Sequence, residues 1–245
     1  MLELERAAVP GWRAPEEARL GDWLLRAAEG FTGRANSALA VGDPGLPPAQ
    51  AVEAVCDWYR ARALPPMIAV PYATGLPDTS EVDRFLAGRG WTIRPGAATV
   101  MTAAPGEVAR PEGVTAVEVG TEPDDDWLAL YHYRGQALPP IARRLLMSAP
   151  WQGFARVRLA GRTIAIGRVA GTGEWAGLTA IEVDPAYRRR GLGAAVSAAL
   201  AAAAAERGVP GLYLQVEDGN LAARTLYGSL GFTDHHGYHY RLAPG

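Results

Sequence analysis

Cysteine is almost absent from this chain of 245 residues, in which only Cys56 occurs. A single cysteine excludes an internal disulfide. Cys56 falls in an apolar pattern with helical spacing and has neither a CxxC neighbour nor an adjacent histidine. We therefore expect a buried apolar residue at this position, not a catalytic thiol. The length allows one or two domains with sizeable cores.

An excess of charge of either sign is also missing, since 24 Lys and Arg stand against 26 Asp and Glu, for a net charge of −2. This balance excludes the broad basic surface that nucleic-acid binding needs. No apolar run reaches membrane-spanning length, because the alanine-rich tract is weakly apolar and is interrupted by Ser197. The amino terminus also lacks the apolar segment of a signal peptide. We expect a cytoplasmic protein that binds neither nucleic acid nor a membrane.

The second half of the chain contains a predicted strand, a basic turn and a helix in succession. Leu178–Val183 is a short run rich in β-branched residues, and Pro185 ends it because proline cannot donate to a sheet ladder. From Gly191 to Glu206 the chain consists mainly of Ala, Leu and Val, a helix-forming composition, and Gly208 supplies the stop. The arginines Arg188–Arg190 therefore lie where a helix begins.

The position of these arginines needs a physical reason, because cations at a helix N-terminus oppose the helix dipole. A bound anion would remove the conflict. The free N–H groups of the first turn, the neighbouring glycines and the guanidinium groups would together form a cradle for a phosphate or pyrophosphate. A solvated basic turn is the alternative, and a short glycine motif alone does not decide between the two.

Periodicity and turn residues predict the other elements. In the first half these are a short helical segment at Glu16–Leu20, strands at Trp23–Arg26, Ser37–Val41, Met67–Val70 and Ala97–Ala103, and helices at Ala49–Ala63 and Asp78–Gly88, the latter capped by Asp78 or Thr79. In the second half they are strands at Val114–Val119 and Gly211–Val216, helices at Asp124–Tyr133, Pro139–Met147 and Asn220–Ser229, a hairpin of Phe154–Leu159 with Thr163–Val169, and a final hairpin at Gly231–Leu242 that turns at His236-Gly237. The stretch 105–113 is rich in Pro, Gly and charge, which is typical of a linker. We therefore expect one domain at 1–104 and a second at 114–245.

Two motifs in the second half carry a resemblance to a known family. Val183-Asp184-Pro185 precedes Arg188-Arg189-Arg190-Gly191-Leu192-Gly193, and later come Asn220, Ala223, Leu226-Tyr227 and Gly231-Phe232. Over roughly residues 114–243 the chain resembles the GNAT superfamily of acetyl-CoA-dependent N-acetyltransferases. The resemblance implies an α/β (α+β) fold with a mixed central sheet flanked by helices. It also implies acetyl-CoA as the acetyl donor and no metal.

The resemblance further implies a coenzyme site, residue by residue. The family's turn holds the pyrophosphate, which here implies Arg188, Arg189, Arg190, Gly191, Leu192, Gly193 and Ala194. The main chain of the preceding strand, at Ile181, Glu182 and Val183, would pair with the pantetheine arm. Asn220 would bind the coenzyme arm, and Tyr227 would lie near the sulfur and donate a proton to it. A tyrosine that only packs on the sheet is the alternative for Tyr227.

The general base is less well marked by the motifs. Some members of the family have a glutamate on the strand before the asparagine, where this chain has Gln215, which cannot act as a base. Glu182 is the nearest carboxylate on the strand before the basic turn, and the family elsewhere uses that strand for the same role. A structural charge or an arginine partner is the alternative for Glu182. Glu174 and Glu217 are weaker candidates.

Three histidines and an aspartate near the carboxyl end suggest a metal site at first sight: Asp234, His235, His236 and His239. Metal ligands must converge, however, and alternate residues of the predicted hairpin point to opposite faces. We expect no metal there and expect these residues to line or cap the substrate end. Trp151 and Trp175, at the beginnings of strands, are further candidates for substrate contacts.

The first half resembles the later part of a GNAT fold in the order of its elements, with Phe85–Trp91 similar to the Leu-Tyr-x-x-x-Gly-Phe segment. Because it lacks the pyrophosphate turn, we expect a degenerate GNAT-like domain, as in tandem GNAT proteins. The strings GFTGRANSALAVGDPGLPP and WYRARALPPMIAVP resemble, more weakly, an actinobacterial-type family labelled N-acetylglutamate synthase-like. An unrelated α/β cap is the alternative.

Two classes of function follow from these resemblances. The first is an enzyme that transfers an acetyl group from acetyl-CoA to the primary amine of a small molecule, for example an amino acid such as glutamate, as a monomer or homodimer. A protein N-terminus or lysine is an alternative acceptor. The second class is a sensor or interaction module that binds acyl-CoA without turnover, which Gln215 keeps open.

Overall fold

The computed structural model describes residues 1–76, 80–111, 116–132 and 137–244. Its strands are β1 Glu16–Leu20, β2 Trp23–Ala27, β3 Ala38–Leu39, β4 Met67–Ala73, β5 Thr92–Ile93, β6 Ala98–Ala103, β7 Glu118–Gly120, β8 Trp151–Leu159, β9 Arg162–Thr172, β10 Trp175–Val183, β11 Gly211–Glu217 and β12 Thr233–Leu242. Its α-helices are α1 Leu2–Ala8, α2 Pro48–Arg60, α3 Glu81–Gly88, α4 Asp125–Leu130, α5 Ile141–Leu146, α6 Leu192–Glu206 and α7 Leu221–Ser229. Short 3-10 turns lie at Val9–Gly11, Pro105–Glu107 and Pro185–Tyr187. The predicted fold class, a mixed sheet flanked by helices, is confirmed.

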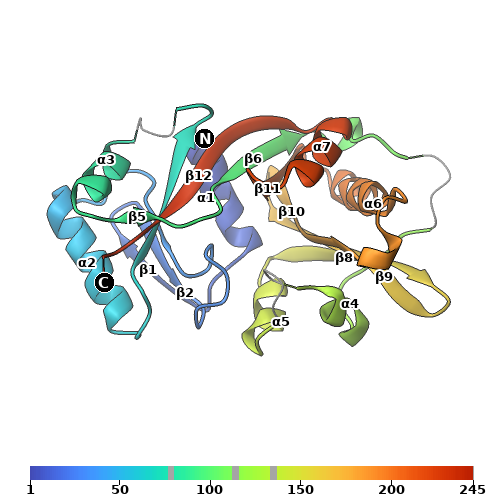
Figure 1. Cartoon of the computed structure of the whole chain (residues 1–245), viewed down its shortest axis with the longest axis horizontal. Coiled ribbons are helices and arrows are strands. Elements are labelled where there is room, and N and C mark those ends of the chain that lie inside the picture. The colour runs from blue at the N-terminus through green and yellow to red at the C-terminus, as the bar shows by residue number, and fades with distance from the viewer. Residues whose placement is uncertain (77–79, 112–115, 133–136, 245) are drawn as a thin grey trace.

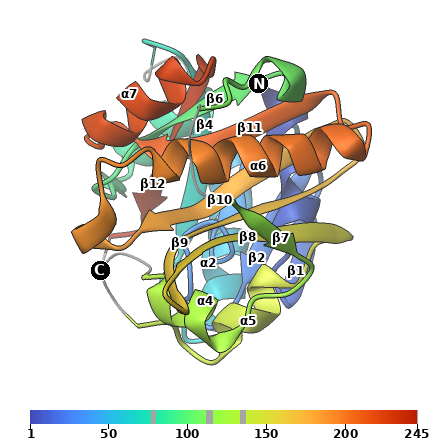
Figure 2. The same cartoon turned by 90° about the vertical axis from the view of Figure 1, so that its right-hand side faces the viewer.

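Within the described residues, twelve strands form one sheet in the order β1-β2-β3-β4-β12-β6-β11-β10-β9-β8-β7, with β5 paired to β12. Helices cover both faces of its second half, with α6 and α7 on one side and α4 and α5 on the other (Figure 2). The α6 side is packed by small and branched residues such as Val196 and Leu200. The α4 and α5 side is packed by Trp127, Phe154 and Ile166.

The two halves of the chain share this sheet. β6 lies between β11 and β12 and is antiparallel to both. β12 then continues past β6 and pairs with β4 from His236 to Leu242. Figure 1 shows β12 running from the half that holds α6 and α7 into the half that holds α2 and α3. The strand before the expected linker is thus paired with strands that follow the linker, and the division into two domains stays a prediction.

The predicted final hairpin is wrong, because β12 is a single strand from Thr233 to Leu242. At the expected turn there is only a register shift between Asp234 and His236. Gly237 is extended and pairs with strands on both sides, and a Cβ atom at this position would lie 2.2 Å from the ring of Tyr72. The glycine therefore permits close approach of an aromatic ring and does not mark a turn.

The predicted helical segment at Glu16–Leu20 is also wrong, because these residues form β1 and pair with β2. Their helix-forming composition is overridden by sheet pairing, since Gly21 has a φ of 54° and allows a tight connection to β2. The helix α1 and the strand β5 were not predicted. The other predicted elements are present with bounds that differ by a few residues.

Three predicted element ends fall outside the described residues. The expected helix start and caps at Asp78 and Thr79 lie there, and the observed cap of α3 is Ser80, whose hydroxyl accepts the N–H of Asp83. The start of the strand expected at Val114–Val119 also lies there, and the described strand is β7. The third is the end of the helix expected at Asp124–Tyr133, since Tyr133 is not among the described residues and α4 ends at Leu130.

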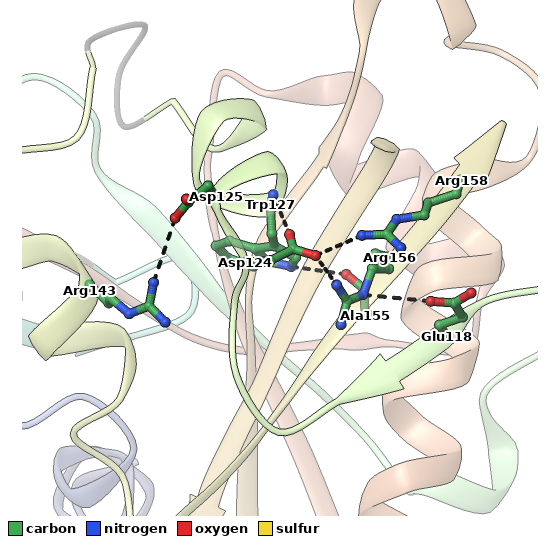
Figure 3. Close-up of polar contacts among 8 residues, drawn as sticks. All are labelled: Glu118, Asp124, Asp125, Trp127, Arg143, Ala155, Arg156 and Arg158. Carbon is green, nitrogen blue, oxygen red and sulfur yellow. Dashed lines mark hydrogen bonds and ion pairs between the residues drawn. The ribbon is translucent and has the colours of Figure 1, made fainter. Parts of the chain in front are cut away.

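Asp124 fastens α4 to the sheet (Figure 3). One of its carboxylate oxygens accepts the N–H of Trp127 at 2.8 Å and caps the helix. The other accepts hydrogen bonds from Arg156 and Arg158 of β8. The indole of Trp127 is fully buried and donates to the carbonyl of Ala155 at 3.0 Å. This anchoring places the segment after α4 beside the end of β10.

Candidate active site

The site begins where β10 separates from β11. The two strands pair only from Trp175 to Leu178 on β10. The register of β10 with β9 then shifts between Thr179 and Glu182, and Ala180 has a φ of 53°, which is costly for a residue with a side chain. This bulge turns the end of β10 away from β11. Over residues 179–183, the edge of β10 that faces β11 has no strand partner among the described residues.

A cleft of about 730 Å³ opens between the separated strands. From the second half of the chain it is lined by residues that include Ile181, Glu182, Gln215, Glu217, Asn220 and Tyr227. From the first half it is lined by Trp12, Thr32, Gly33, Arg34, Arg94, Pro95 and Gly96, and β12 adds Tyr238 and Tyr240. Strand separation therefore brings predicted residues together with a second set that sequence reasoning missed.

Tyr227 projects from α7 into the cleft. Its ring also packs edge-on against Phe232, with 5.9 Å between the ring centroids. Burial raises the pKa of the phenol to about 12. The ring therefore packs on the core and the residue also lines the cleft, while its role as a proton donor stays a prediction.

Glu182 lies partly buried on β10, and its carboxylate accepts the main-chain N–H of His132 at 2.8 Å. Burial raises the pKa of this carboxyl group, the hydrogen bond from His132 opposes the shift, and the net direction is upward. The charge of Arg188 also lowers the pKa of Glu182, although no arginine among the described residues lies within ion-pair distance of its carboxylate. A carboxyl group with a raised pKa in a cleft has the properties of a general base.

The basic turn lies between the end of β10 and the start of α6. Arg189 and Gly191 both have a positive φ, of 63° and 75°, and Gly191 is the N-cap of α6. The side chain of Arg188 donates to the carbonyl of Val183 at 3.2 Å. The N–H groups of a first helical turn have no acceptor within their own helix, so they point outward here. The turn does not line the cleft itself but follows directly on the strand that does.

Close packing fixes the start of α6 against α7. A Cβ atom at Gly193 would lie 3.2 Å from the side chain of Leu226. Leu192 and Ala194 flank this glycine in the first turn of the helix. Asn220 caps α7 by accepting the N–H of Ala223 at 3.1 Å. Asn220 also lines the cleft.

Several other predicted candidates lie outside the cleft. Glu174 is in the exposed connection between β9 and β10. Trp151 stacks with Arg207, whose guanidinium carbon is 4.6 Å from the ring centroid, and Trp175 lies against Gly211. Neither tryptophan lines the cleft.

Two of the histidines of β12 contact each other, since Nδ1 of His235 lies 2.7 Å from Nδ1 of His236, but His239 makes a separate contact. His236 is buried and hydrogen bonds through Nε2 to Glu5 at 2.8 Å. His239 hydrogen bonds through Nε2 to Asp83 at 2.6 Å, and Asp234 accepts from Arg224. In the part of the chain that the structure describes, no group of three or more His, Cys, Asp or Glu side chains is placed to hold a metal ion. These residues fasten β12 to α1, α3 and α7, and they do not line the cleft.

The loop that carries Arg34 is closed by Asn36. The amide nitrogen of Asn36 donates to the carbonyls of Phe31 and Thr32, and its oxygen accepts the N–H groups of Ala28 and Gly30. The glycine-rich composition of this loop was the available signal for a built turn. Nothing in the linear sequence placed it opposite β10.

A fully buried arginine supports the same wall of the cleft. Arg168 donates to the carbonyls of Leu146 and Gly11, and its guanidinium carbon lies 5.1 Å from the ring centroid of Trp12. Burial lowers the pKa of Arg168 to about 9. This contact joins α5, β9 and the segment after α1.

Comparisons with known proteins agree with the motifs and the fold. The sequence model of a family described as "Probable histone acetyltransferase Rv0428c C-terminal" matches residues 1–241. The chain is 33% identical over 245 residues to the probable histone acetyltransferase Rv0428c of Mycobacterium tuberculosis, covering 98% of this chain and 72% of that protein. It is 26% identical over 242 residues to the uncharacterized N-acetyltransferase YobR of Bacillus subtilis, covering 98% and 97% of the two chains.

A solved structure shows the same fold. The GCN5-related N-acetyltransferase from Kribbella flavida superposes with a TM-score of 0.75 at 17% identity, covering 100% of this chain and 95% of that one. In the described residues no helix has the length and apolar character to cross a membrane. The tandem arrangement and the N-acetylglutamate synthase-like resemblance stay predictions. The chain belongs to the family of the C-terminal region of probable histone acetyltransferase Rv0428c, and it is a GNAT N-acetyltransferase, as its two motifs predicted.

Proposed function

We propose that this enzyme transfers the acetyl group of acetyl-CoA to the primary amine of a small molecule by direct attack. The observation that carries the proposal is the cleft between β10 and β11, which has an unpaired strand edge on one side and the Tyr227 hydroxyl on the other. An extended, amide-containing arm can add to such an edge as a strand would. We place the pantetheine arm of the coenzyme along this edge, where Asn220 would bind it. The pyrophosphate would then lie at the first turn of α6.

In the proposed reaction Glu182 accepts a proton and Tyr227 donates one. The ammonium group of the acceptor gives a proton to Glu182, directly or through a water molecule, and becomes a nucleophilic amine. The amine nitrogen attacks the thioester carbonyl, the C–N bond forms, and the C–S bond breaks as the tetrahedral intermediate collapses. The hydroxyl group of Tyr227 gives its proton to the leaving thiolate, and the excess proton that remains on the attacking nitrogen passes to the resulting tyrosinate, directly or through a water molecule. The products are an acetamide and coenzyme A.

Two other functions have an observation in their favour. The name of the M. tuberculosis relative favours a protein lysine as the acceptor. Gln215, in the cleft where a carboxylate would be expected, favours a protein that binds acyl-CoA without turnover.

Replacement of Tyr227 by phenylalanine tests the proposed donor. We expect kcat to fall roughly 10²-fold, because general acid catalysis contributes about that much, while acetyl-CoA affinity stays nearly constant. Thiol release from acetyl-CoA over a panel of small amines and lysine peptides measures kcat, and calorimetric titration measures affinity. Tight coenzyme binding without thiol release from any acceptor would establish the sensor function instead.

A further inference from the structure

Two arginines of the first half line the cleft and lack carboxylate partners. Arg34 lies in the loop between β2 and β3, and Arg94 follows β5. Within the described residues neither guanidinium group forms an ion pair, and the Nε atom of each is buried without a hydrogen-bond partner. Burying a charge is costly unless an opposite charge accompanies it. The pair therefore suits a bound anion.

The two guanidinium groups lie on neighbouring parts of the wall. A Cβ atom at Gly33 would lie 2.6 Å from an Nη atom of Arg94, so the Arg94 guanidinium rests on the residue next to Arg34. The guanidinium carbon of Arg94 is 4.2 Å from the ring centroid of Tyr240, and that of Arg34 is 5.7 Å from the ring centroid of Trp12. Aromatic faces orient guanidinium groups. The side chain of Arg34 also hydrogen bonds to Tyr238, while the Nε atoms of both arginines lack a partner that a carboxylate could supply.

The electrostatic surroundings favour the charged form of Arg34 without forming an ion pair with it among the described residues. Burial raises the pKa values of the phenols of Tyr238 and Tyr240, which therefore stay neutral. Burial lowers the pKa of Arg34, but the neighbouring tyrosines raise it and the net direction is upward. Glu5 also raises the pKa of Arg34, and its carboxylate hydrogen bonds to His236 at 2.8 Å. Glu182 and Glu217 line the same cleft.

The arginines lie across the sheet opening from α6 and α7. Trp12, which stacks on Arg34, belongs to the core beneath α4 and α5, whereas Tyr227 packs on the core beneath α6. If the coenzyme lies along β10 beside α7, the arginines face the acceptor. The side-chain oxygen of Gln215, buried and without a partner in the same cleft, can accept a hydrogen bond from an ammonium group.

We propose that Arg34 and Arg94 bind a carboxylate group of the acceptor, so that the substrate is an amino acid or another small amine that carries a carboxylate. This inference rests on the proposed acetyl transfer and names the class of its acceptor. A lysine-rich polypeptide would instead bring positive charge toward two arginines.

Matched acceptors test the inference without any mutation. Each α-amino acid in a panel of glycine, leucine, phenylalanine and glutamate is compared with its α-carboxamide in the thiol-release assay. We expect kcat/KM for the best amino acid to exceed that for its carboxamide roughly tenfold or more, since a charge-assisted hydrogen bond contributes at least that much. Equal use of the two, or a preference for lysine peptides over every amino acid, would overturn the inference.

Variants then assign the preference to the arginines. In Arg34→Gln and Arg94→Gln the ratio of kcat/KM for the amino acid to kcat/KM for its carboxamide should fall toward one. The change should come from a higher KM for the amino acid, while the affinity for acetyl-CoA is unchanged. Arg60→Gln is the matched control, because Arg60 is exposed on α2 and, among the described residues, pairs with Asp57 on the same helix. An acid-to-carboxamide ratio that survives in both cleft variants would contradict the assignment.

A binding experiment separates this inference from the proposed function. An N-acetyl amino acid and its carboxamide are titrated into protein saturated with coenzyme A, which requires no turnover. If no amine releases thiol but the acid binds more tightly than the carboxamide and needs Arg94, the transferase proposal fails and the carboxylate site stands. If thiol is released but acid and carboxamide bind alike, the carboxylate site fails alone.

Discussion

Single residues in the cleft owe their proposed roles to burial. Burial raises the pKa of Tyr227 to about 12, so the phenol holds its proton at neutral pH. The pKa of Glu182 is raised by the same cause, while the N–H of His132 still favours its ionised form. A donor that stays protonated and a carboxylate that can take a proton are the two groups that acetyl transfer from a thioester to an ammonium group requires.

Glu182→Gln tests the proposed base, because the amide keeps an oxygen that can accept the N–H of His132. In the natural protein kcat/KM should rise with pH through a pKa above the usual value of about 4.3 for glutamate. The variant should lose roughly 10²-fold in kcat and lose this acid limb, since its side chain does not titrate. An unchanged pH profile in the variant would assign the base to another group.

The same pKa shift predicts an effect on stability. Because the native pKa of Glu182 lies above that of the unfolded chain, the native state binds more protons between the two values. The contribution of this residue to stability therefore falls as the pH rises from the unfolded toward the native pKa. Urea unfolding measured across this pH interval should show a falling free energy of unfolding in the natural protein, and this decline should be absent in Glu182→Gln.

At the scale of elements, the start of α6 is the proposed pyrophosphate site. The glycines at the two ends of this helix offer a matched pair of positions for substitution. Gly191 and Gly208 bound the helix and have similar positive φ values, of 75° and 71°. Leucine at either position should cost about 1–2 kcal/mol of unfolding free energy, because a side chain strains this conformation. Only Gly191→Leu should abolish acetyl-CoA binding in calorimetry. Equal affinity in the two variants would place the coenzyme elsewhere.

The attachment of α4 decides where the segment with Tyr131 and His132 lies in the cleft. Asp124→Ala removes the helix cap and the contacts with Arg156 and Arg158, and it should lower the unfolding free energy by about 2 kcal/mol. Asp125→Ala is the control, because this neighbour is exposed and lies 3.9 Å from Arg143 (Figure 3). Urea denaturation measures the loss of unfolding free energy in both variants. A cost for Asp125→Ala as large as that for Asp124→Ala would show that the anchor is not specific.

At the scale of the whole molecule, the single sheet has a consequence for folding. A fragment of residues 105–245 would lack β6 and leave β11 and β12 with unpaired inner edges. We expect this fragment to show no cooperative unfolding by circular dichroism, whereas the full chain melts in one transition. A fragment that folds and binds acetyl-CoA alone would support the two independent domains that the linker composition predicts.

The sequence predicted the elements of the second half of the fold more accurately than those of the first half, because the signals in the second half are local. The elements from β8 to α7 have strong local signals, such as the alanine-rich composition of α6 and the proline after β10. β1 and β12 have weak or misleading ones, because their state depends on pairing with strands distant in the chain. Gly237 was assigned to a turn because a sequence does not show that Tyr72 packs on it.

The sequence by itself determined the family, the α6 turn and the candidates Tyr227, Glu182 and Asn220, because these depend on residues close together in the chain. Only the tertiary structure decided that β6 enters the sheet between β11 and β12, and that the loop of Arg34 and the residue Arg94 face the end of β10. Contacts between residues so far apart are made by packing and strand pairing, which no local pattern encodes. The wall that we propose to bind the acceptor is therefore formed only when the two halves of the chain join in one sheet.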